Sequence, residues 1–231
     1  MIGAFSKAFS QLSDPSFRRV VWIGVLGSIV IFVVSWLVLA FVLKSFDLPK
    51  IDLWVYELDL NDIKELLGGV AVLLLTWLLF PVTVTLIVGF FLEDVANAVD
   101  AKHYPGLEPA RVQSIPEILW VSVKFLVVAL VVNILALPIL IPLLFTPLSP
   151  FVFYPLNGYL LGREYYELVA YRRLDPRAAK SLRKARSGGV FTAGVGIAIL
   201  LTIPVLNLLA PIVATAAMVH LVERWRATSA A

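Results

Sequence analysis

Two adjacent arginines, Arg18 and Arg19, stand where an anion could bind. They follow Asp14, Pro15 and Ser16, an order typical of a helix start because Pro is favoured in the first turn. Backbone N–H groups at a helix N-terminus are free to donate, and the helix dipole favours negative charge there. Guanidinium groups have a fork geometry that suits a tetrahedral oxyanion. The helix start is therefore a candidate anion site. The alternative is that both arginines only flank a membrane helix.

A second set of polar side chains lies at the edges of long uncharged runs: Glu93, Asn97, Asp100, Arg163, Glu164 and Glu167. The first three are spaced i, i+4, i+7 and form a polar stripe on a helix, and Arg163 and Glu167 are an i, i+4 pair. Charges this close to hydrocarbon usually face protein or a water-filled cavity. Two roles stay open for the set: a polar pore lining, or a structural ion pair between Glu93 and Arg163.

The elements that carry these residues are dictated by an unusually apolar composition. Of the 231 residues, 60% are hydrophobic and 15% are charged, and the mean hydropathy is +0.92. Soluble globular proteins carry roughly 25% charged residues. Four stretches of 24, 27, 38 and 36 residues contain no Asp, Glu, Lys or Arg (20–43, 66–92, 125–162 and 187–222). Apolar stretches of this length indicate membrane spans, so the composition excludes a soluble enzyme and a nucleic-acid binder.

The pattern predicts an all-α integral membrane protein with two long transmembrane helices, over 15–44 and 62–103. An amphipathic helix over 1–14 suits the headgroup layer. Helix–proline turn–helix patterns over 115–173 and 188–226 predict two partly inserted hairpins. In the first, the helix is expected to stop at Pro138. In the second, two arms of 16 residues, each about 24 Å long, are too short to cross the membrane. Six full spans remain an alternative.

A basic surface helix is expected over 176–186, between the two hairpins. It serves either to anchor lipid headgroups or to collect anions at a pore mouth. Segment 163–186 holds eight Lys and Arg residues. By the positive-inside rule this segment and both termini face the cytoplasm. Gly158 and Gly162 form a G-x-x-x-G that permits close helix packing and is compatible with oligomer contacts.

Catalytic and metal chemistry find little support in the residue types. The chain has no cysteine and two histidines, and no His–carboxylate spacing of a metal enzyme is present. There is no phosphate-binding loop, no dinucleotide fingerprint and no nucleophile with a partnered base. We therefore expect no enzyme activity, no catalytic residues, no metal and no cofactor.

Several segments together resemble the CysZ-type sulfate permease family, which includes the etoposide-induced-protein-like membrane proteins. The resemblance rests on AFSQLSDPSFRR (8–19), FF at 90–91 with VAN at 95–97, NGYLLGREYYELVA (157–170) and IPVLNLLAP (203–211), followed by ATAA (214–217). It implies two long transmembrane helices plus two pairs of partly inserted helices, assembled as a homo-oligomer in the lipid bilayer.

The resemblance also implies a function: passive uptake of sulfate across the bacterial inner membrane for cysteine synthesis, without ATP. A Gly-Leu-Arg-Arg type motif before the first span binds sulfate in that family, and the matching positions here are Ser16, Phe17, Arg18 and Arg19. Ser16 and Phe17 replace the Gly and Leu of the motif. The alternative function is that of a non-transporting membrane-organising protein of the same superfamily.

Overall fold

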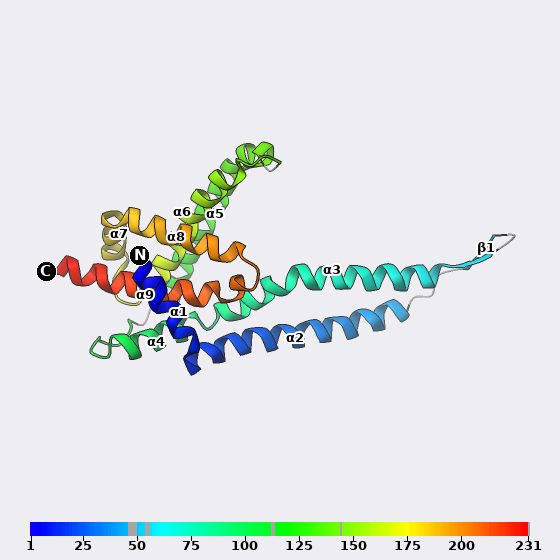
Figure 1. Cartoon of the computed structure of the whole chain (residues 1–231), viewed down its shortest axis with the longest axis horizontal. Coiled ribbons are helices and arrows are strands. Elements are labelled where there is room, and N and C mark those ends of the chain that lie inside the picture. The colour runs from blue at the N-terminus through cyan, green and yellow to red at the C-terminus, as the bar shows by residue number, and fades with distance from the viewer. Residues whose placement is uncertain (46–49, 54–55, 112–113, 144, 231) are drawn as a thin grey trace. The chain divides into compact units, whose positions relative to one another are not determined.

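The computed structural model describes residues 1–45, 50–53, 56–111, 114–143 and 145–230 (Figure 1). The chain divides into two compact units. Unit 1 contains Met1–Arg18 and Leu92–Ala231, and unit 2 contains Arg19–Phe91. Each unit is treated by itself below.

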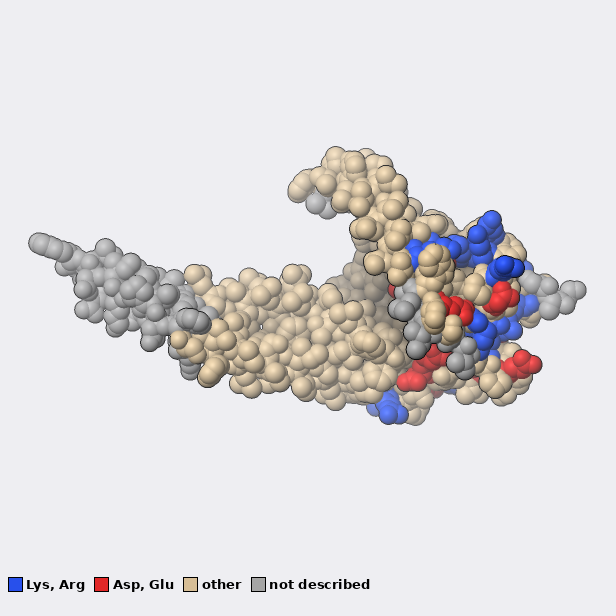
Figure 2. All heavy atoms as spheres, turned by 180° about the vertical axis from the view of Figure 1, so that it is seen from behind, with Lys and Arg blue, Asp and Glu red and all other residues tan. Residues whose placement is uncertain are grey.

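Unit 2 is an antiparallel pair of long apolar helices. Helix α2 covers Pro15–Lys44 and enters unit 2 at Arg19, and α3 covers Leu60–Gly89. Strands β1 (Lys50–Leu53) and β2 (Tyr56–Asp59) pair antiparallel between them, with Lys50 opposite Asp59. Both helices contain a stretch long and apolar enough to cross a membrane, 15–42 and 67–89, and only 6% of an 18-residue apolar window in each is buried. Their surface is uncharged over most of its length (Figure 2), as expected for helices that face lipid.

A few specific contacts hold α2 against α3. Trp36 donates an indole N–H to the Thr76 hydroxyl at 2.8 Å, and the rings of Phe32 and Phe80 lie 6.0 Å apart. Gly24 lies so close to Val88 that an added Cβ would approach a Val88 methyl to 2.7 Å. Small residues at helix crossings allow backbones to approach closely, which is the main source of packing energy where lipid removes the hydrophobic drive.

The sequence predicts one helix over 62–103, but the structure divides this segment into two helices. Helix α3 ends at Gly89, Phe90 and Phe91 form a turn, and α4 begins at Leu92 and runs to His103. The N–H groups of Phe90 and Phe91 bond the carbonyls three residues back. Glu93 and Asp94 occupy the first turn of α4, where the helix dipole favours acids, and this local preference supports a new helix start.

Unit 1 is built around α9 (Leu206–Ala230). Helices α1 (Ile2–Ser10), α4, α6 (Ser149–Ala170) and α8 (Ser187–Thr202) all pack against it (Figure 1). A short 3-10 helix, η1, covers Gln11–Ser13. The 23 residues from Leu206 to Thr228 could cross a membrane, yet 78% of an 18-residue apolar window within them is buried inside the protein. The buried face of α9 is rich in alanine, including positions 210, 214, 216 and 217, so neighbouring helices can approach from several sides.

The remaining helices of unit 1 are α5 (Ile115–Leu143) and α7 (Pro176–Ala185). Helix α5 runs through Pro138 and Pro142, so the expected stop at Pro138 is wrong. The expectation of a 16-residue second arm over 207–222 in the last hairpin is also wrong, because α9 has 25 residues and continues to Ala230. Proline removes one backbone donor and bends a helix without necessarily ending it. Within the described residues, four helical stretches are thus long and apolar enough to cross a membrane, the other two being 123–143 and 206–228.

The turn between α8 and α9 is strained. Val205 has φ 69°, the one positive φ of a non-glycine residue in the described part of the chain, and its side chain is 73% exposed. A β-branched residue in the left-handed region is unfavourable. The α8 and α9 arms must therefore hold the turn in place through their own packing.

The closest helix contact in unit 1 is between α6 and α8. Gly158 and Gly162 of α6 face Val190, Gly194 and Val195 of α8. A Cβ at position 194 would overlap the carbonyl oxygen of Gly158 and the amide nitrogen of Gly162. The predicted close approach at the G-x-x-x-G therefore exists, and its partner is a helix of the same chain.

We expect Gly194→Ala to destabilise the protein, because the added methyl must push two backbones apart. Overpacking of this kind costs about 1–3 kcal/mol, or roughly 2–10 °C in the midpoint of thermal unfolding for a chain of this size. Gly188→Ala on the same helix is the matched control, since nothing lies within 4 Å of its added Cβ. Thermal unfolding in detergent measures both. Equal midpoints for the two variants would contradict the tight α6–α8 contact.

Candidate functional site

The candidate anion site lies at the first turn of α2. The helix begins at Pro15, and the Arg18 N–H donates to the Asp14 carbonyl at 3.0 Å as the first helical hydrogen bond. Phe17 is fully buried, whereas Ser16, Arg18 and Arg19 are exposed. Burial of Phe17 fixes the first turn, so the two arginines project from a rigid helix start.

The charge balance at this turn favours an anion. Asp14 is the residue just before the helix, and its carboxylate accepts two hydrogen bonds of 2.9 Å from the Lys102 ammonium. Lys102 therefore neutralises the carboxylate that precedes the helix. Arg18 and Arg19 make no ion pair within the described ranges, and the side chains of both are open to solvent. Two uncompensated guanidinium groups beside a helix N-terminus can bind an oxyanion.

The polar stripe of α4 meets a different arginine from the one expected. Arg172 is 3% exposed, and its guanidinium bonds Asp100 Oδ2 at 2.9 Å, Glu93 Oε1 at 3.5 Å and the side-chain oxygen of Asn97. The expected Glu93–Arg163 ion pair is therefore wrong. Arg172 lies in the turn after α6, and from there its side chain reaches across the whole stripe.

The same cluster continues through Arg173 to α9. Arg173 donates hydrogen bonds to Asp100 Oδ2 at 2.7 Å and to the Glu108 carbonyl, and its Nε forms an ion pair with Glu223 Oε1 at 3.5 Å. Glu223 also pairs with Arg226 at 2.7 Å. We call Asp100, Arg172, Arg173 and Glu223, with Glu93 and Asn97, the arginine network. It joins α4, the turn after α6 and the C-terminal part of α9.

Sequence reasoning missed Arg172, Arg173 and Glu223. In the sequence, Arg172 and Arg173 were counted only among the eight Lys and Arg residues of segment 163–186. Glu223 ends the fourth uncharged run in the way that Glu93 ends the second. An acid in that position, and a pair of adjacent arginines directly after an apolar helix, were the signals that could have found them.

The other predicted polar residues form a separate cluster. Arg163 Nε bonds Glu167 Oε1 at 2.8 Å, and both side chains are about nine-tenths buried. Glu167 Oε1 also lies 3.8 Å from Arg183 Nε of α7. Glu164 is exposed and makes no ion pair among the residues that the structure describes. The six residues predicted as one set thus divide between the arginine network, the Arg163–Glu167–Arg183 cluster and an outlying Glu164.

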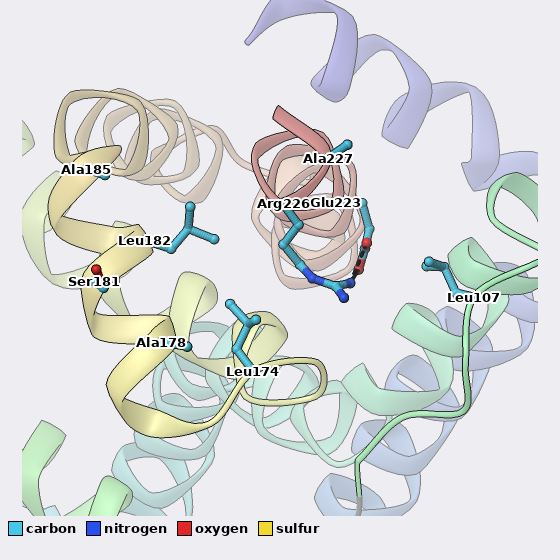
Figure 3. A pocket seen from close by; sticks show the side chains of 9 residues that line it. All are labelled: Leu107, Leu174, Ala178, Ser181, Leu182, Ala185, Glu223, Arg226 and Ala227. Carbon is cyan, nitrogen blue, oxygen red and sulfur yellow. Dashed lines mark hydrogen bonds and ion pairs between the residues drawn. The ribbon is translucent and has the colours of Figure 1, made fainter. Parts of the chain in front are cut away.

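A cavity of about 660 Å³ lies between α7 and α9 (Figure 3). Leu107, Leu174 and Leu182 line it together with alanine side chains, and the Glu223–Arg226 ion pair forms one side. Because the two charges in its wall neutralise each other, this cavity offers no excess positive charge to an oxyanion.

Two histidines meet at the end of α4. The rings of His103 and His220 lie 4.8 Å apart edge-on, and Tyr104 Oη is 2.9 Å from His220 Nδ1. Burial, with Lys102 and Lys7 nearby, lowers the pKa of His103, so its ring is neutral at pH 7. No group of three His, Asp or Glu side chains in the described ranges could hold a metal ion.

Comparison with known proteins gives one finding. The family model described as sulfate transporter CysZ/etoposide-induced protein 2.4 matches residues 4–211. The matched range includes the first turn of α2, the stripe of α4 and the Arg163–Glu167 pair, and it ends before Glu223. Among curated proteins, no match to the chain is found.

We expect Arg172→Met to destabilise unit 1 strongly. The substitution leaves the Asp100 carboxylate, which is 13% exposed at its side chain, short of one of its two arginine partners. Breaking a buried pair on one side typically costs about 3–5 kcal/mol. Arg224→Met is the control, since Arg224 lies in α9 and is exposed; its cost should stay within about 0.5 kcal/mol. Chemical unfolding followed by tryptophan fluorescence measures both, and an unchanged midpoint for Arg172→Met would contradict the network.

Proposed function

The chain belongs to the sulfate transporter CysZ/etoposide-induced protein 2.4 family, and on this premise we propose that it is a permease or channel for sulfate or a related oxyanion. The observation that carries the proposal is the pair of exposed, uncompensated arginines at the first turn of α2, preceded by a carboxylate that Lys102 already neutralises. Ser16 and Phe17 complete the turn. A dianion held there would receive helix N–H groups and two guanidinium forks.

Transport is proposed to be passive, in a bacterial inner membrane, supplying sulfate for cysteine synthesis. No phosphate-binding loop for ATP is present in the sequence. The family's description is that of a transporter, which supports transport rather than catalysis. Four helical stretches long and apolar enough to cross a bilayer support a multi-pass protein.

Both termini are proposed to face the cytoplasm. Ion pairs connect Asp14 with Lys102, Asp100 with Arg173, and Arg173 with Glu223. Charged ends that bond one another lie on the same side of a bilayer, because their charges cannot meet across hydrocarbon. Segment 163–186, with its eight Lys and Arg residues, belongs to that side, and the positive-inside rule makes it the cytoplasmic one.

A homo-oligomer is proposed as the working form. In each of α2, α3 and α5 only 6% of an 18-residue apolar window is buried in the single chain, so lipid or further copies must cover these helices. The three acids of the arginine network are balanced by Arg172, Arg173 and the Arg226 that pairs with Glu223, which favours a structural role for Glu93, Asn97 and Asp100. The path of the pore then depends on the surfaces at which copies of the chain contact one another.

Sulfate flux tests the proposal. Proteoliposomes containing the wild-type protein should take up radiolabelled sulfate without ATP, and Arg18→Ala/Arg19→Ala should reduce the initial rate at low sulfate by about tenfold or more, because it removes charge-assisted hydrogen bonds to the anion. Phosphate and chloride as competitors establish selectivity.

The matched control is Arg177→Ala/Lys180→Ala. It removes the same charge from the exposed face of α7 and should leave the rate within about twofold. Equal losses of uptake rate in both double variants would mean that Arg18 and Arg19 act only through general surface charge and not as a binding site. Absence of flux from well-folded protein would overturn the permease and favour the membrane-organising alternative.

A further inference from the structure

A second cationic cavity lies where α6, α7 and α8 meet. It has a volume of about 120 Å³ and is lined by Tyr159 and Arg163 of α6, Arg183 and Lys184 of α7, and Ser187 and Phe191 of α8. A volume of this size matches one small polyatomic group, since a single water occupies about 30 Å³ in the liquid. The cavity shares no residue with the first turn of α2.

The charges around this cavity do not cancel. Arg163, Arg183 and Lys184 supply three positive charges, and Glu167 is the acid that pairs with two of them. One carboxylate against three cations leaves two positive charges, the complement of a sulfate or a doubly ionised phosphate. This distinguishes the cavity from the larger one in Figure 3, where Glu223 and Arg226 balance.

Arg163 is buried with donors left over. The residue is 5% exposed, and its Nε is committed to Glu167. Its two terminal nitrogens donate no hydrogen bond within the described part of the chain, although the side chain lines the cavity. These terminal donors are not enclosed by protein, so they can donate to water or to an anion in the cavity. An oxyanion there would accept charge-assisted hydrogen bonds from Arg163.

The N-terminus of α8 adds backbone donors to the same place. Ser187 is the first residue of this 16-residue helix, and no side chain caps it. The first backbone hydrogen bond comes from Val190 to the Arg186 carbonyl, so the N–H groups of the first turn remain available. Free N–H groups and the positive end of a helix dipole favour an anion.

From this geometry we propose that the α6–α7–α8 cavity binds one tetrahedral oxyanion group through Arg163, Arg183, Lys184 and the first turn of α8. The group is either a free sulfate or phosphate, or the phosphate of an anionic lipid headgroup. Tyr159 and Phe191 at the cavity are 46% and 38% exposed, and aromatic side chains of this kind are common at the membrane interface. The site is separate from the proposed permeation site and does not depend on it.

Binding is tested in the Arg18→Ala/Arg19→Ala protein, so that the first turn of α2 contributes nothing. The midpoint of thermal unfolding is followed in non-ionic detergent against sodium sulfate and sodium phosphate, with sodium chloride at equal ionic strength as reference. A second arm uses nanodiscs of phosphatidylcholine with and without phosphatidylglycerol. A ligand that binds the folded state raises the midpoint with the logarithm of its concentration relative to its dissociation constant.

The variants are Lys184→Gln and Arg183→Gln, and the matched control is Lys180→Gln, an exposed lysine one turn earlier on α7 that does not line the cavity. We expect the apparent dissociation constant to rise about fivefold in Lys184→Gln and about tenfold in Arg183→Gln, and to stay within about twofold in the control. Lys184 is exposed, so its variant keeps the test valid if Arg183→Gln folds poorly.

Sulfate and phosphate also stabilise folded proteins by exclusion from their surface, so a shift that Lys184→Gln weakens and Lys180→Gln does not identifies a free anion as the ligand, and a shift that is unchanged in Lys184→Gln and Arg183→Gln overturns the site. A shift only with phosphatidylglycerol identifies a lipid headgroup, and both results support the site. Protection that does not exceed that of chloride or phosphatidylcholine, or an equal loss in Lys180→Gln, overturns it. Sulfate uptake plays no part in these readouts, so failure of the permease proposal and failure of this one are distinguishable.

Discussion

The interaction on which unit 1 depends most is the burial of Arg172. A guanidinium almost removed from solvent must find acceptors, and it finds them in Glu93, Asn97 and Asp100 along one face of α4. Arg173 extends the same network to Glu223 of α9. Since each acid or base is costly to bury alone, α4, the turn after α6 and α9 are fixed together. The geometry of the unit follows from satisfying these charges at the edge of apolar helices.

Close packing inside unit 1 depends on glycine and alanine, which have no side chain or a very small one. Gly158 and Gly162 let α6 meet α8 backbone to backbone, and the alanines of α9 let it serve as a common partner for its neighbours. The α6–α8 contact also brings Arg163 close to the first turn of α8. Packing and the cationic cavity therefore have one cause, because a bulkier residue at Gly162 or Gly194 would open the junction at which the positive charges converge.

Features set by local chemistry could be predicted from the sequence. The start of α2 at Pro15, the bounds of α7 and the Arg163–Glu167 pair depend on nearby residues. Proline misled the prediction at 138, because a helix tolerates a lost donor when its neighbours compensate. The length of α9 was underestimated for a different reason, since the predicted arm was ended at the first charge, Glu223, whereas the helix continues to Ala230. The arginine that pairs with the polar stripe of α4 could not be predicted from the sequence either. Choosing between Arg163 and Arg172 requires knowing how α6 is oriented. That orientation is determined by contacts between residues far apart in the sequence. The roles of Ser16–Arg19 rest on transport and binding, not on the fold.

The central position of α9 has a consequence for biogenesis. A ribosome makes α1, α4, α6 and α8 before α9, yet these are the helices that α9 packs against. Helices α6 and α8 can pack together at once, but until α9 is made the faces that contact it have no partner, and Arg173 lacks Glu223. The unit therefore completes its fold only when synthesis of α9 is finished.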